Sequence, residues 1–242
     1  VTTGILAAEA MRDHAGFLLR NAVGRPRVTL KIATSLDGRI ATASGHSQWI
    51  TGPIARRAVH AMRARHDAVM VGAGTARADD PMLTVRGMGA RRQPVRVVVS
   101  RRLDLPLDLG LARSARDVPV WLCHGDAVDP ARAASWRATG ARLLPCAVAA
   151  GQVEPDALLS ALGAAGLTRV FCEGGGALAA SLIGAGLVDE LVGFTAGCAI
   201  GAEGLPGLGA LGLSRLDEAP RFELSETRAI GGDVMHRWLR VG

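Results

Sequence analysis

The segment Glu173-Gly174-Gly175-Gly176 has the composition of a phosphate-binding turn. It follows an apolar run at residues 169–172 and precedes a helix-forming run at 177–185. Glycines leave room for backbone amides to approach an anion, and the start of a helix adds unpaired N–H groups and the positive end of the helix dipole. The segment matches neither GxGxxG nor a Walker loop, so a turn that is merely tight remains the alternative.

Two charged residues lie where a sheet would present them to a ligand. Glu173 closes the apolar run 170–172, and a carboxylate buried there needs a polar partner. Lys31 is the only lysine of the chain and alternates with apolar residues in the run 28–34. In a desolvated cleft its ammonium could donate a proton or hold a hydroxyl group. A solvated rim glutamate and a snorkelling edge lysine are the structural alternatives.

More polar side chains gather around residues 72–74 and in the connection 44–51. Acids near a glycine turn can accept hydrogen bonds from sugar hydroxyls, and arginines can clamp phosphate. In the connection, Ser47 and Trp49 offer a hydroxyl and a large flat ring that could cover a planar ligand. Solvated ion pairs, and a core position for Trp49, would explain the same residues. The group around 72–74 is Thr75, Asp79, Asp80, Arg63 and Arg86.

The common metal and hydrolase signatures are missing from the sequence. The six histidines form no HExxH pattern, no GxSxG is present, and no HxE precedes a PCxxC. The four cysteines are too far apart for a zinc knuckle, and we expect them to be small core residues. A glycine turn, cleft cations and no metal spacing together indicate a nucleotide-dependent enzyme without a metal.

The composition is that of a globular protein. The chain has 242 residues, of which 49% are hydrophobic and 21% charged. It contains no apolar run long enough for a membrane span and no secretory signal pattern, so we expect a cytoplasmic protein. The net charge of +6 invites anionic partners. However, the arginines are scattered, only 3% of residues are aromatic and there is no tyrosine, so we expect no nucleic-acid binding.

Strand-like and helix-like segments alternate along the chain. This alternation predicts an α/β fold with a mostly parallel sheet, helices on both faces and a C-terminal antiparallel hairpin around Gly231-Gly232. The expected strands are 28–34, 68–71, 95–99, 118–123, 142–144, 169–172, 222–230 and 234–241, and the expected helices are 53–65, 131–138, 155–165 and 177–185. Before them, residues 4–22 read as one amphipathic helix.

A set of motifs in this order resembles the reductase domain of the bifunctional riboflavin-biosynthesis protein RibD. The resemblance runs from about Gly4 to the C-terminus. Its motifs are Lys31-Ile32-Ala33-Thr34-Ser35-Leu36-Asp37-Gly38-Arg39, Ser47-Gln48-Trp49-Ile50-Thr51, Gly72-Ala73-Gly74-Thr75, Ala78-Asp79-Asp80-Pro81, Leu83-Thr84-Val85-Arg86 and Glu173-Gly174-Gly175.

The resemblance implies a dihydrofolate-reductase-like three-layer fold. Residues 1–25 are similar to the segment that follows the family's deaminase domain, and residues 26–242 would form the reductase domain. The first residue is Val1, so we expect a fragment or processed chain of a deaminase–reductase, with a stand-alone reductase as the alternative. The resemblance also implies that this chain forms a homodimer, as is common in the family.

The implied reaction is NADPH-dependent reduction of the ribosyl group of 5-amino-6-(5-phosphoribosylamino)uracil to a ribityl chain. Lys31 would handle the proton or orient the ribose, with Asp79 as its charge partner, and Glu173 completes the expected catalytic group. The cofactor would contact Ala33, Trp49, Thr75, Asp79, Gly175, Gly176, Ala177, Leu178, Ala179, Ala180 and Ser181. The phosphoribosyl-pyrimidine would contact Lys31, Ser47, Arg63, Leu83, Arg86 and Glu173.

One motif departs from the family. Where the family commonly has Asp-Ser-Arg after a strand, this chain has Ser100-Arg101-Arg102. Arg101 replaces a serine expected to touch the cofactor, and its guanidinium could grip the 2′-phosphate that distinguishes NADPH from NADH.

Three other functions remain open. The substrate could be the 2,5-diaminopyrimidinone used by related reductases. A pterin, as in dihydrofolate reductases, is less favoured because such enzymes place a carboxylate early in a helix, whereas this chain has Lys31 in a strand and arginines nearby. A non-catalytic basic binding domain is the alternative from another class.

Overall fold

A nine-stranded sheet is built around strand β1 (Arg27–Ser35) in the computed structural model, which describes residues 3–241. The other strands of this sheet are β3 (Ala68–Gly72), β4 (Val95–Val99), β5 (Val120–His124), β6 (Arg142–Pro145), β9 (Arg169–Cys172), β10 (Glu190–Ala196), β12 (Phe222–Ile230) and β13 (Asp233–Arg240). Their order across the sheet is β12-β13-β10-β1-β9-β3-β4-β5-β6. Two short ribbons pair β2 (Arg39–Ala41) with β11 (Leu205–Pro206) and β7 (Val148–Ala149) with β8 (Gln152–Val153).

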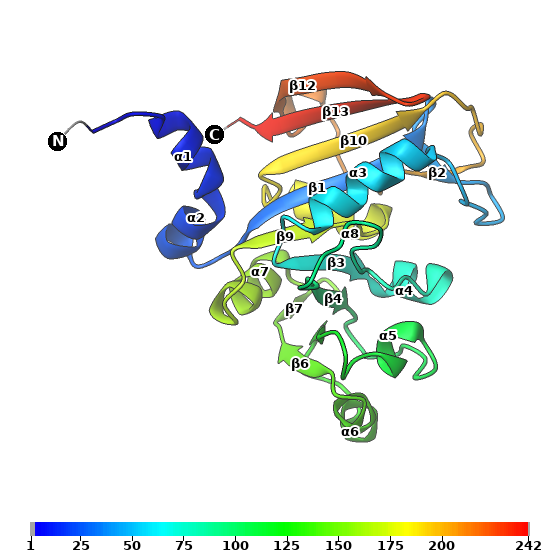
Figure 1. The fold of residues 1–242 in the computed structure, drawn as a ribbon. Helices are drawn as coiled ribbons and strands as arrows, with labels where there is room; N and C mark the ends of the chain where they lie inside the picture. Colours follow the sequence, from blue (N-terminus) through cyan, green and yellow to red (C-terminus); the bar gives the residue numbers. More distant parts are fainter. Residues whose placement is uncertain (1–2, 242) are drawn as a thin grey trace.

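The sheet is parallel from β10 to β6 and ends in an antiparallel hairpin. Strand β1 pairs in parallel with β10 on one side and β9 on the other. Strand β13 runs antiparallel to both β10 and β12. The predicted mostly parallel sheet with a C-terminal hairpin is confirmed (Figure 1).

Helices cover both faces, which confirms the three-layer arrangement. They are α3 (Pro53–Arg63), α4 (Ala73–Asp79), α5 (Gly110–Arg113), α6 (Pro130–Ala138), α7 (Pro155–Ala164) and α8 (Gly176–Gly184), with one 3₁₀ turn at Leu216–Glu218. One core contains residues of α3 to α6, including Val59 and Trp136. The other contains residues of α7 and α8, including Leu162 and Leu182. Figure 1 shows the sheet as the layer between them.

Strand β1 alternates as its sequence predicts. Val28 and Leu30 are fully buried in the α7–α8 core, and Ile32 packs against that core. Ala33 packs on the opposite side, against the core under α3. Lys31 therefore shares the face of the sheet that α3 covers.

Strand β10 was not predicted, although it is the parallel neighbour of β1. Its sequence begins with a glutamate and has a glycine in the middle, so no β-branched run marks it. Glu190 is buried because Arg27, Thr29 and Arg237 donate to its carboxylate. Gly193 is needed because a Cβ there would overlap the ring of His236 on β13. Tertiary packing, which the local sequence does not show, makes this segment a strand.

The single helix expected at 4–22 is wrong. The structure has α1 (Ala7–Asp13) and α2 (Ala15–Val23), separated at His14. The carbonyls of Arg12 and Asp13 accept hydrogen bonds from the Arg169 guanidinium, which ends α1 at this point.

Residues 73–79 form helix α4, where the sequence indicated only a turn. Gly72 is the residue before its first turn, with extended backbone. Thr75 and Asp79 are four residues apart and therefore lie on one side of α4.

Three cysteines are core residues as expected, but Cys198 is exposed, so the expectation is wrong for that one. Within residues 3–241, no helix is long and apolar enough to cross a membrane.

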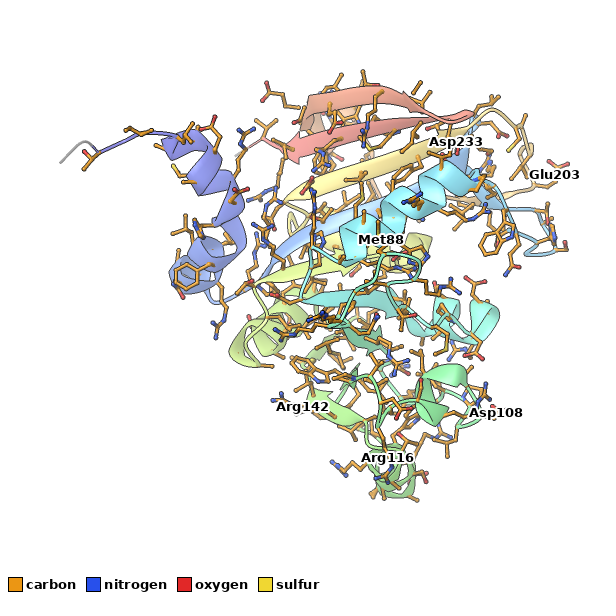
Figure 2. All side chains as sticks on the ribbon, in the orientation of Figure 1. Met88, Asp108, Arg116, Arg142, Glu203 and Asp233 are labelled. Carbon is orange, nitrogen blue, oxygen red and sulfur yellow. The ribbon has the colours of Figure 1, made fainter. Side chains whose placement is uncertain are left out.

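Two polar contacts fix the start of α3, the helix that reaches the site. The backbone N–H of Gly52 donates to Asp233 Oδ2 at 2.7 Å, which ties the helix start to the first residue of β13. Asp233 is buried and labelled in Figure 2. Arg56 Nη1 donates to the Thr51 carbonyl at 2.6 Å within the first turn.

Gly163→Ala should destabilise the domain. A Cβ at Gly163 in α7 would overlap the carbonyl oxygen of Gly24, where the chain leaves α2. We expect the free energy of unfolding in urea to fall by about 1–3 kcal/mol. The control is Gly184→Ala at the end of α8, where the nearest atom, on Leu211, is 3.8 Å away. An equal loss of unfolding free energy in Gly163→Ala and Gly184→Ala would contradict the close packing of α7 against Gly24.

Candidate active site

Two adjoining pockets open at the carboxyl edge of the parallel strands, where ligands bind in open α/β sheets. The larger, of about 720 Å³, lies beyond the ends of β3 and β4 and is called the glycine pocket. The smaller, of about 390 Å³, lies beside β1, α3 and the end of β9 and is called the lysine pocket. The backbone N–H of Gly175 donates to Thr75 Oγ1 at 3.1 Å, which joins the two glycine turns between the pockets.

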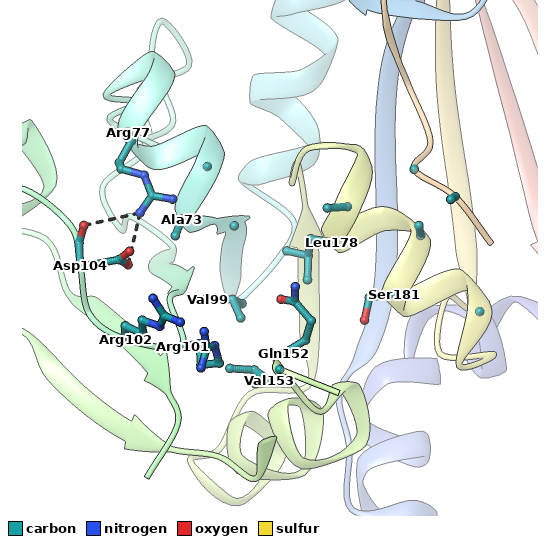
Figure 3. Close-up of a pocket in the computed structure, with 18 of the residues that line it drawn as sticks. Ala73, Arg77, Val99, Arg101, Arg102, Asp104, Gln152, Val153, Leu178 and Ser181 are labelled. Carbon is teal, nitrogen blue, oxygen red and sulfur yellow. Dashed lines mark hydrogen bonds and ion pairs between the residues drawn. The ribbon is translucent and has the colours of Figure 1, made fainter. Parts of the chain in front are cut away.

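The glycine pocket is lined by small residues of two helix starts. They include Gly72 and Gly74 before and in α4, Ala177, Leu178 and Ser181 in α8, and Gly209 from a later loop. Figure 3 shows Leu178 and Ser181 on α8 facing Ala73 and Val99 across this pocket.

Close contacts require glycine at two positions beside this pocket. A Cβ at Gly174 would come 2.8 Å from Leu178 Cδ2, and one at Gly176 would come 3.1 Å from the Gly209 nitrogen. Space around Gly74 is open, with no atom within 4 Å of its added Cβ. Helix α8 begins after Gly175 without a side-chain cap, so its first turn offers backbone amides to the pocket.

Three arginines and one aspartate lie at the far side of the glycine pocket. Arg77 donates to Asp104 Oδ1 at 3.2 Å, and both side chains are largely exposed (Figure 3). Asp104 also accepts a hydrogen bond from Ser100. Among residues 3–241, no acceptor is bound to the guanidinium groups of Arg101 and Arg102. This side of the pocket therefore has an excess of positive charge.

A bidentate ion pair forms the wall of the lysine pocket. Arg63, at the end of α3, donates from Nε and Nη2 to the two oxygens of Glu173 at 2.5 and 3.1 Å. Its Nη1 donates to the Thr84 carbonyl at 2.9 Å. The Arg63 and Glu173 side chains are only 12% and 11% exposed. Burial raises the pKa of Glu173, but the charge and hydrogen bonds of Arg63 outweigh this and hold the pKa below its usual value.

Lys31 lies in the same pocket without a hydrogen-bonding partner among residues 3–241. Its side chain retains some accessible surface, yet protein atoms surround it on most sides. This burial lowers the pKa of Lys31, the charge of Glu173 raises it, and the charge of Arg63 lowers it further. The result is an ammonium that releases its proton more readily than an exposed lysine.

The expected pairing of Lys31 with Asp79 is wrong. The carboxylate whose charge acts on Lys31 is Glu173, and no contact between Lys31 and Asp79 is found among residues 3–241. Asp79 lines the same pocket from α4, and partial burial raises its pKa.

Trp49 is an exposed side chain at the mouth of the lysine pocket, not a core residue. It is 67% exposed. The Arg56 guanidinium lies over its ring at 4.6 Å from the centroid, which is a cation–π contact.

The structure brings most of the predicted site residues to these pockets. Those at the lysine pocket are Lys31, Ala33, Ser47, Trp49, Arg63, Thr75, Asp79, Arg86, Glu173 and Gly175. Those at the glycine pocket are Arg101, Ala177, Leu178, Ala180 and Ser181.

Three predicted contact residues line neither pocket. Ala179 is fully buried in the α7–α8 core, because it lies on the side of α8 that faces the sheet. Leu83 is 2% exposed and packs in the opposite core. Gly176 is in contact with the loop at Gly209, whose N–H donates to the Gly176 carbonyl.

Asp80, expected to accept from a sugar, has a structural partner. Its Oδ1 accepts the backbone N–H of Gly110 at 2.8 Å, at the start of α5.

Several pocket residues were missed from the sequence. Arg56, Val59 and His60 are among them, and with the predicted Arg63 they form one stripe of α3 along the lysine pocket, which the spacing i, i+3, i+4, i+7 could have revealed. The loop at 207–211 and the ribbon residues Gln152 and Val153 also line the pockets, and no local pattern marks them. Residues 3–241 contain no cluster of side chains that could hold a metal ion.

The fold and the paired pockets define a dihydrofolate-reductase-like α/β domain with its site at the carboxyl edge of the sheet. The family model of the RibD C-terminal domain matches residues 26–236. The chain belongs to the RibD C-terminal domain family.

Similar sequences and structures are RibD proteins. The chain is 36% identical to the riboflavin biosynthesis protein RibD of Escherichia coli over 97% of its own length. It is 33% identical to that of Bacillus amyloliquefaciens, again over 97%. Acinetobacter baumannii RibD has a similar structure, with a TM-score of 0.83, 30% identity and 96% of this chain covered.

The chain spans slightly less than two thirds of these relatives, covering 65% and 62% of the two sequences and 63% of the solved chain. A Saccharomyces cerevisiae riboflavin biosynthesis reductase shares the fold over its whole length, with a TM-score of 0.68 at 19% identity.

Glu173→Gln should destabilise the protein because it leaves Arg63 buried without a countercharge. We expect the free energy of unfolding at neutral pH to fall by about 3 kcal/mol. The control Asp104→Asn removes the exposed pair with Arg77 and should cost less than about 1 kcal/mol.

The effect should depend on pH with a definite sign. The pKa of Glu173 is lowered in the folded protein, so its stabilisation is present above the ordinary value of 4.5 and is lost as the pH falls through the folded pKa. The difference in free energy of unfolding between the wild type and Glu173→Gln should therefore become smaller at acid pH. If Glu173→Gln and Asp104→Asn lowered the free energy of unfolding equally at neutral pH, this would contradict the description of the ion pair between Arg63 and Glu173.

Proposed function

We propose that this chain is an NADPH-dependent reductase of the ribosyl group of 5-amino-6-(5-phosphoribosylamino)uracil. A Thermotoga maritima protein described as a deaminase and 5-amino-6-(5-phosphoribosylamino)uracil reductase is 27% identical, with a TM-score of 0.80 over 98% of this chain. The observation that carries the proposal is the hydrogen bond between Gly175 and Thr75 of the lysine pocket, because these residues lie next to Gly74 and Ala177 of the glycine pocket and mark the junction of the two. A dinucleotide in one pocket would reach a substrate in the other across this junction.

The residues of the glycine pocket fit a dinucleotide phosphate. The glycine turns leave a cradle at Gly74, and α8 points its uncapped first turn at the pocket. Anions are favoured at such a helix start because of its free amides and dipole. Arg101 and Arg102 provide positive charge without an acceptor in the described part of the chain, which suits the additional phosphate of NADPH.

When bound, the reduced nicotinamide supplies a hydride for the sugar C1 carbon. The task of the chain is to align two ligands and to supply one proton. As the C1–O4 bond of the ribose opens, its oxygen must take up a proton. We assign this proton to Nζ of Lys31, because burial makes this ammonium a better acid than an exposed lysine. The negative charge of Glu173, held in place by Arg63, raises the pKa of Lys31 and so favours the protonated form that burial disfavours.

The substrate phosphate is assigned to Arg86 and not to Arg63. The Arg63 guanidinium already donates three hydrogen bonds, to Glu173 and to the Thr84 carbonyl, so Arg86 has more donors available for a phosphate. Arg86 is exposed in the same pocket, and its guanidinium has no acceptor among residues 3–241. Ser47, Trp49, Thr75 and Asp79 remain predicted ligand contacts.

Three further assignments stay predictions. A deaminase domain in the full-length chain is consistent with the partial coverage of the relatives. A homodimer is supported by the exposed apolar side chains of Leu224 and Val234 on the edge hairpin. A cytoplasmic location is expected from the composition. The diaminopyrimidinone substrate is an alternative that the same pockets would admit.

Lys31→Met should lower kcat about 100-fold or more, the usual contribution of a general acid. The change removes the proton donor but not the glycine pocket, so NADPH binding measured by fluorescence titration should stay nearly unchanged. Turnover is followed by the loss of NADPH absorbance with the phosphoribosylaminouracil and, separately, the diaminopyrimidinone. Retained turnover would remove Lys31 from this role, and no turnover by the wild type with either substrate would contradict the proposed function.

Arg101→Ala should reduce the preference for NADPH over NADH. If Arg101 binds the 2′-phosphate, kcat/KM with NADPH should fall by about 10-fold or more while kcat/KM with NADH changes little. Arg92→Ala, an exposed arginine outside both pockets, is the control. An unchanged cofactor preference in Arg101→Ala would exclude this assignment.

A further inference from the structure

His60 lies in the lysine pocket between the two charged ends of the α3 stripe. It is one residue after Val59 and three before Arg63, so it faces the pocket from the same side of the helix. It is half-buried and has no place in the proton transfer assigned to Lys31. Its surroundings are the cations Arg63 and Arg86 and the carboxylate of Glu173.

The main chain fixes the state of the His60 ring. The backbone N–H of Arg86 donates to His60 Nδ1 at 3.2 Å. A ring nitrogen that accepts a hydrogen bond carries no proton, so the neutral ring must carry its proton on Nε2. The Thr84 carbonyl is a weak acceptor for the ring N–H, since its effect on the pKa of His60 is the smallest of the groups that act on the ring.

The electrostatic surroundings keep the ring neutral. Burial lowers the pKa of His60 most, and the charges of Arg63 and Arg86 lower it further. The charge of Glu173 and the Thr84 carbonyl raise the pKa of His60, but their effects are smaller. At neutral pH the ring is therefore an acceptor for the Arg86 amide and also carries an N–H donor at the pocket wall, which the Thr84 carbonyl engages only weakly.

The same hydrogen bond acts on the residue assigned to the phosphate. Arg86 follows the segment whose Val85 N–H donates to Gln93 Oε1 at 2.7 Å, and Thr84 is held by Arg63. The His60 contact is thus the second link, after that of Arg63 to Thr84, that fixes the main chain from 84 to 86 against α3. The Arg86 side chain therefore starts from a fixed backbone. It is the cation of the segment 84–86, and its guanidinium has no acceptor among residues 3–241.

We propose that His60 determines specificity for a phosphorylated substrate: Nδ1 positions the Arg86 main chain, and Nε2–H donates a hydrogen bond to the phosphate that Arg86 binds. The proposal rests on the proposed function, because it concerns the same substrate pocket. A neutral donor beside an arginine can bind a phosphate dianion without adding a second fixed charge next to Lys31.

Two substitutions separate the two roles of the ring. In His60→Asn the side-chain oxygen can replace Nδ1 as acceptor for Arg86, but nothing replaces Nε2. In His60→Gln the longer amide can place a donor where Nε2 lies. His60→Ala removes both groups, and His14→Asn, between α1 and α2 and outside both pockets, is the control.

The kinetic test compares the phosphorylated substrate with the same compound lacking its phosphate. For the phosphorylated substrate, we expect KM to rise about 10-fold in His60→Asn and further in His60→Ala, with kcat nearly unchanged. His60→Gln should raise KM less than His60→Asn does, because its amide can replace the Nε2 donor although nothing replaces Nδ1 as acceptor for the Arg86 amide. For the dephosphorylated compound, all variants should match the wild type, because the proposed contact is then absent. Equal losses on both compounds, or no loss in His60→Ala, would overturn the proposal.

A binding test without turnover keeps this result separate from the proposed reaction. Inorganic phosphate is titrated into the protein while the Arg86 amide and the His60 ring nitrogens are followed by NMR. We expect both signals to shift in the wild type, and phosphate to bind about 10-fold more weakly to His60→Asn, whose Arg86 amide should still respond. Phosphate binding to His60→Ala as tight as to the wild type would overturn the role of His60, whether or not the wild type reduces the uracil substrate.

Discussion

The ion pair between Arg63 and Glu173 is the interaction on which the rest of the site depends. It joins the last residue of α3 to the residue that follows β9, and it is almost closed to solvent. Two charges in such a place are tolerated only because both oxygens of the carboxylate are bound by the guanidinium. The pair therefore fixes α3 against the edge of the sheet.

This ion pair also determines what the neighbouring cations can do. Arg63 already donates to Glu173 and to the Thr84 carbonyl, whereas the Arg86 guanidinium in the same pocket has no acceptor among residues 3–241. Lys31 faces the negative and the positive member of the pair together, so its ammonium is partly balanced in spite of its burial. One fixed pair thus separates a proton-handling position from an anion-binding position within a single pocket.

The sequence predicted the fold where local patterns and packing agree. The alternation in β1, the run of β3 and the glycine-flanked helix α8 were recognisable because buried strands and helix ends have strong local signals. Strand β10 was not, since Glu190 and Gly193 become strand residues only through partners on β1 and β13. In the same way, the break at His14 depends on Arg169, which is distant in sequence.

The sequence predicted many of the residues that line the two pockets but not how they pair. Residue types at the strand ends indicated Lys31 and Glu173, yet only the folded chain shows that Arg63 reaches the carboxylate and that Asp79 does not partner the lysine. Only the helical spacing marks His60 in the sequence, because its hydrogen-bonding partner, the Arg86 amide, is 26 residues away. Side-chain partners across a sheet edge depend on distances that no single segment encodes.

The most direct test of this account is the pH dependence of kcat in the wild type and in Glu173→Gln. Lys31 must be protonated to act as the acid, so kcat should fall as the pH rises through its lowered pKa. Removing the charge of Glu173, which raises that pKa, should move this alkaline decline to lower pH. A decline at the same or a higher pH in Glu173→Gln would contradict the claim that the ion pair controls the protonation of Lys31.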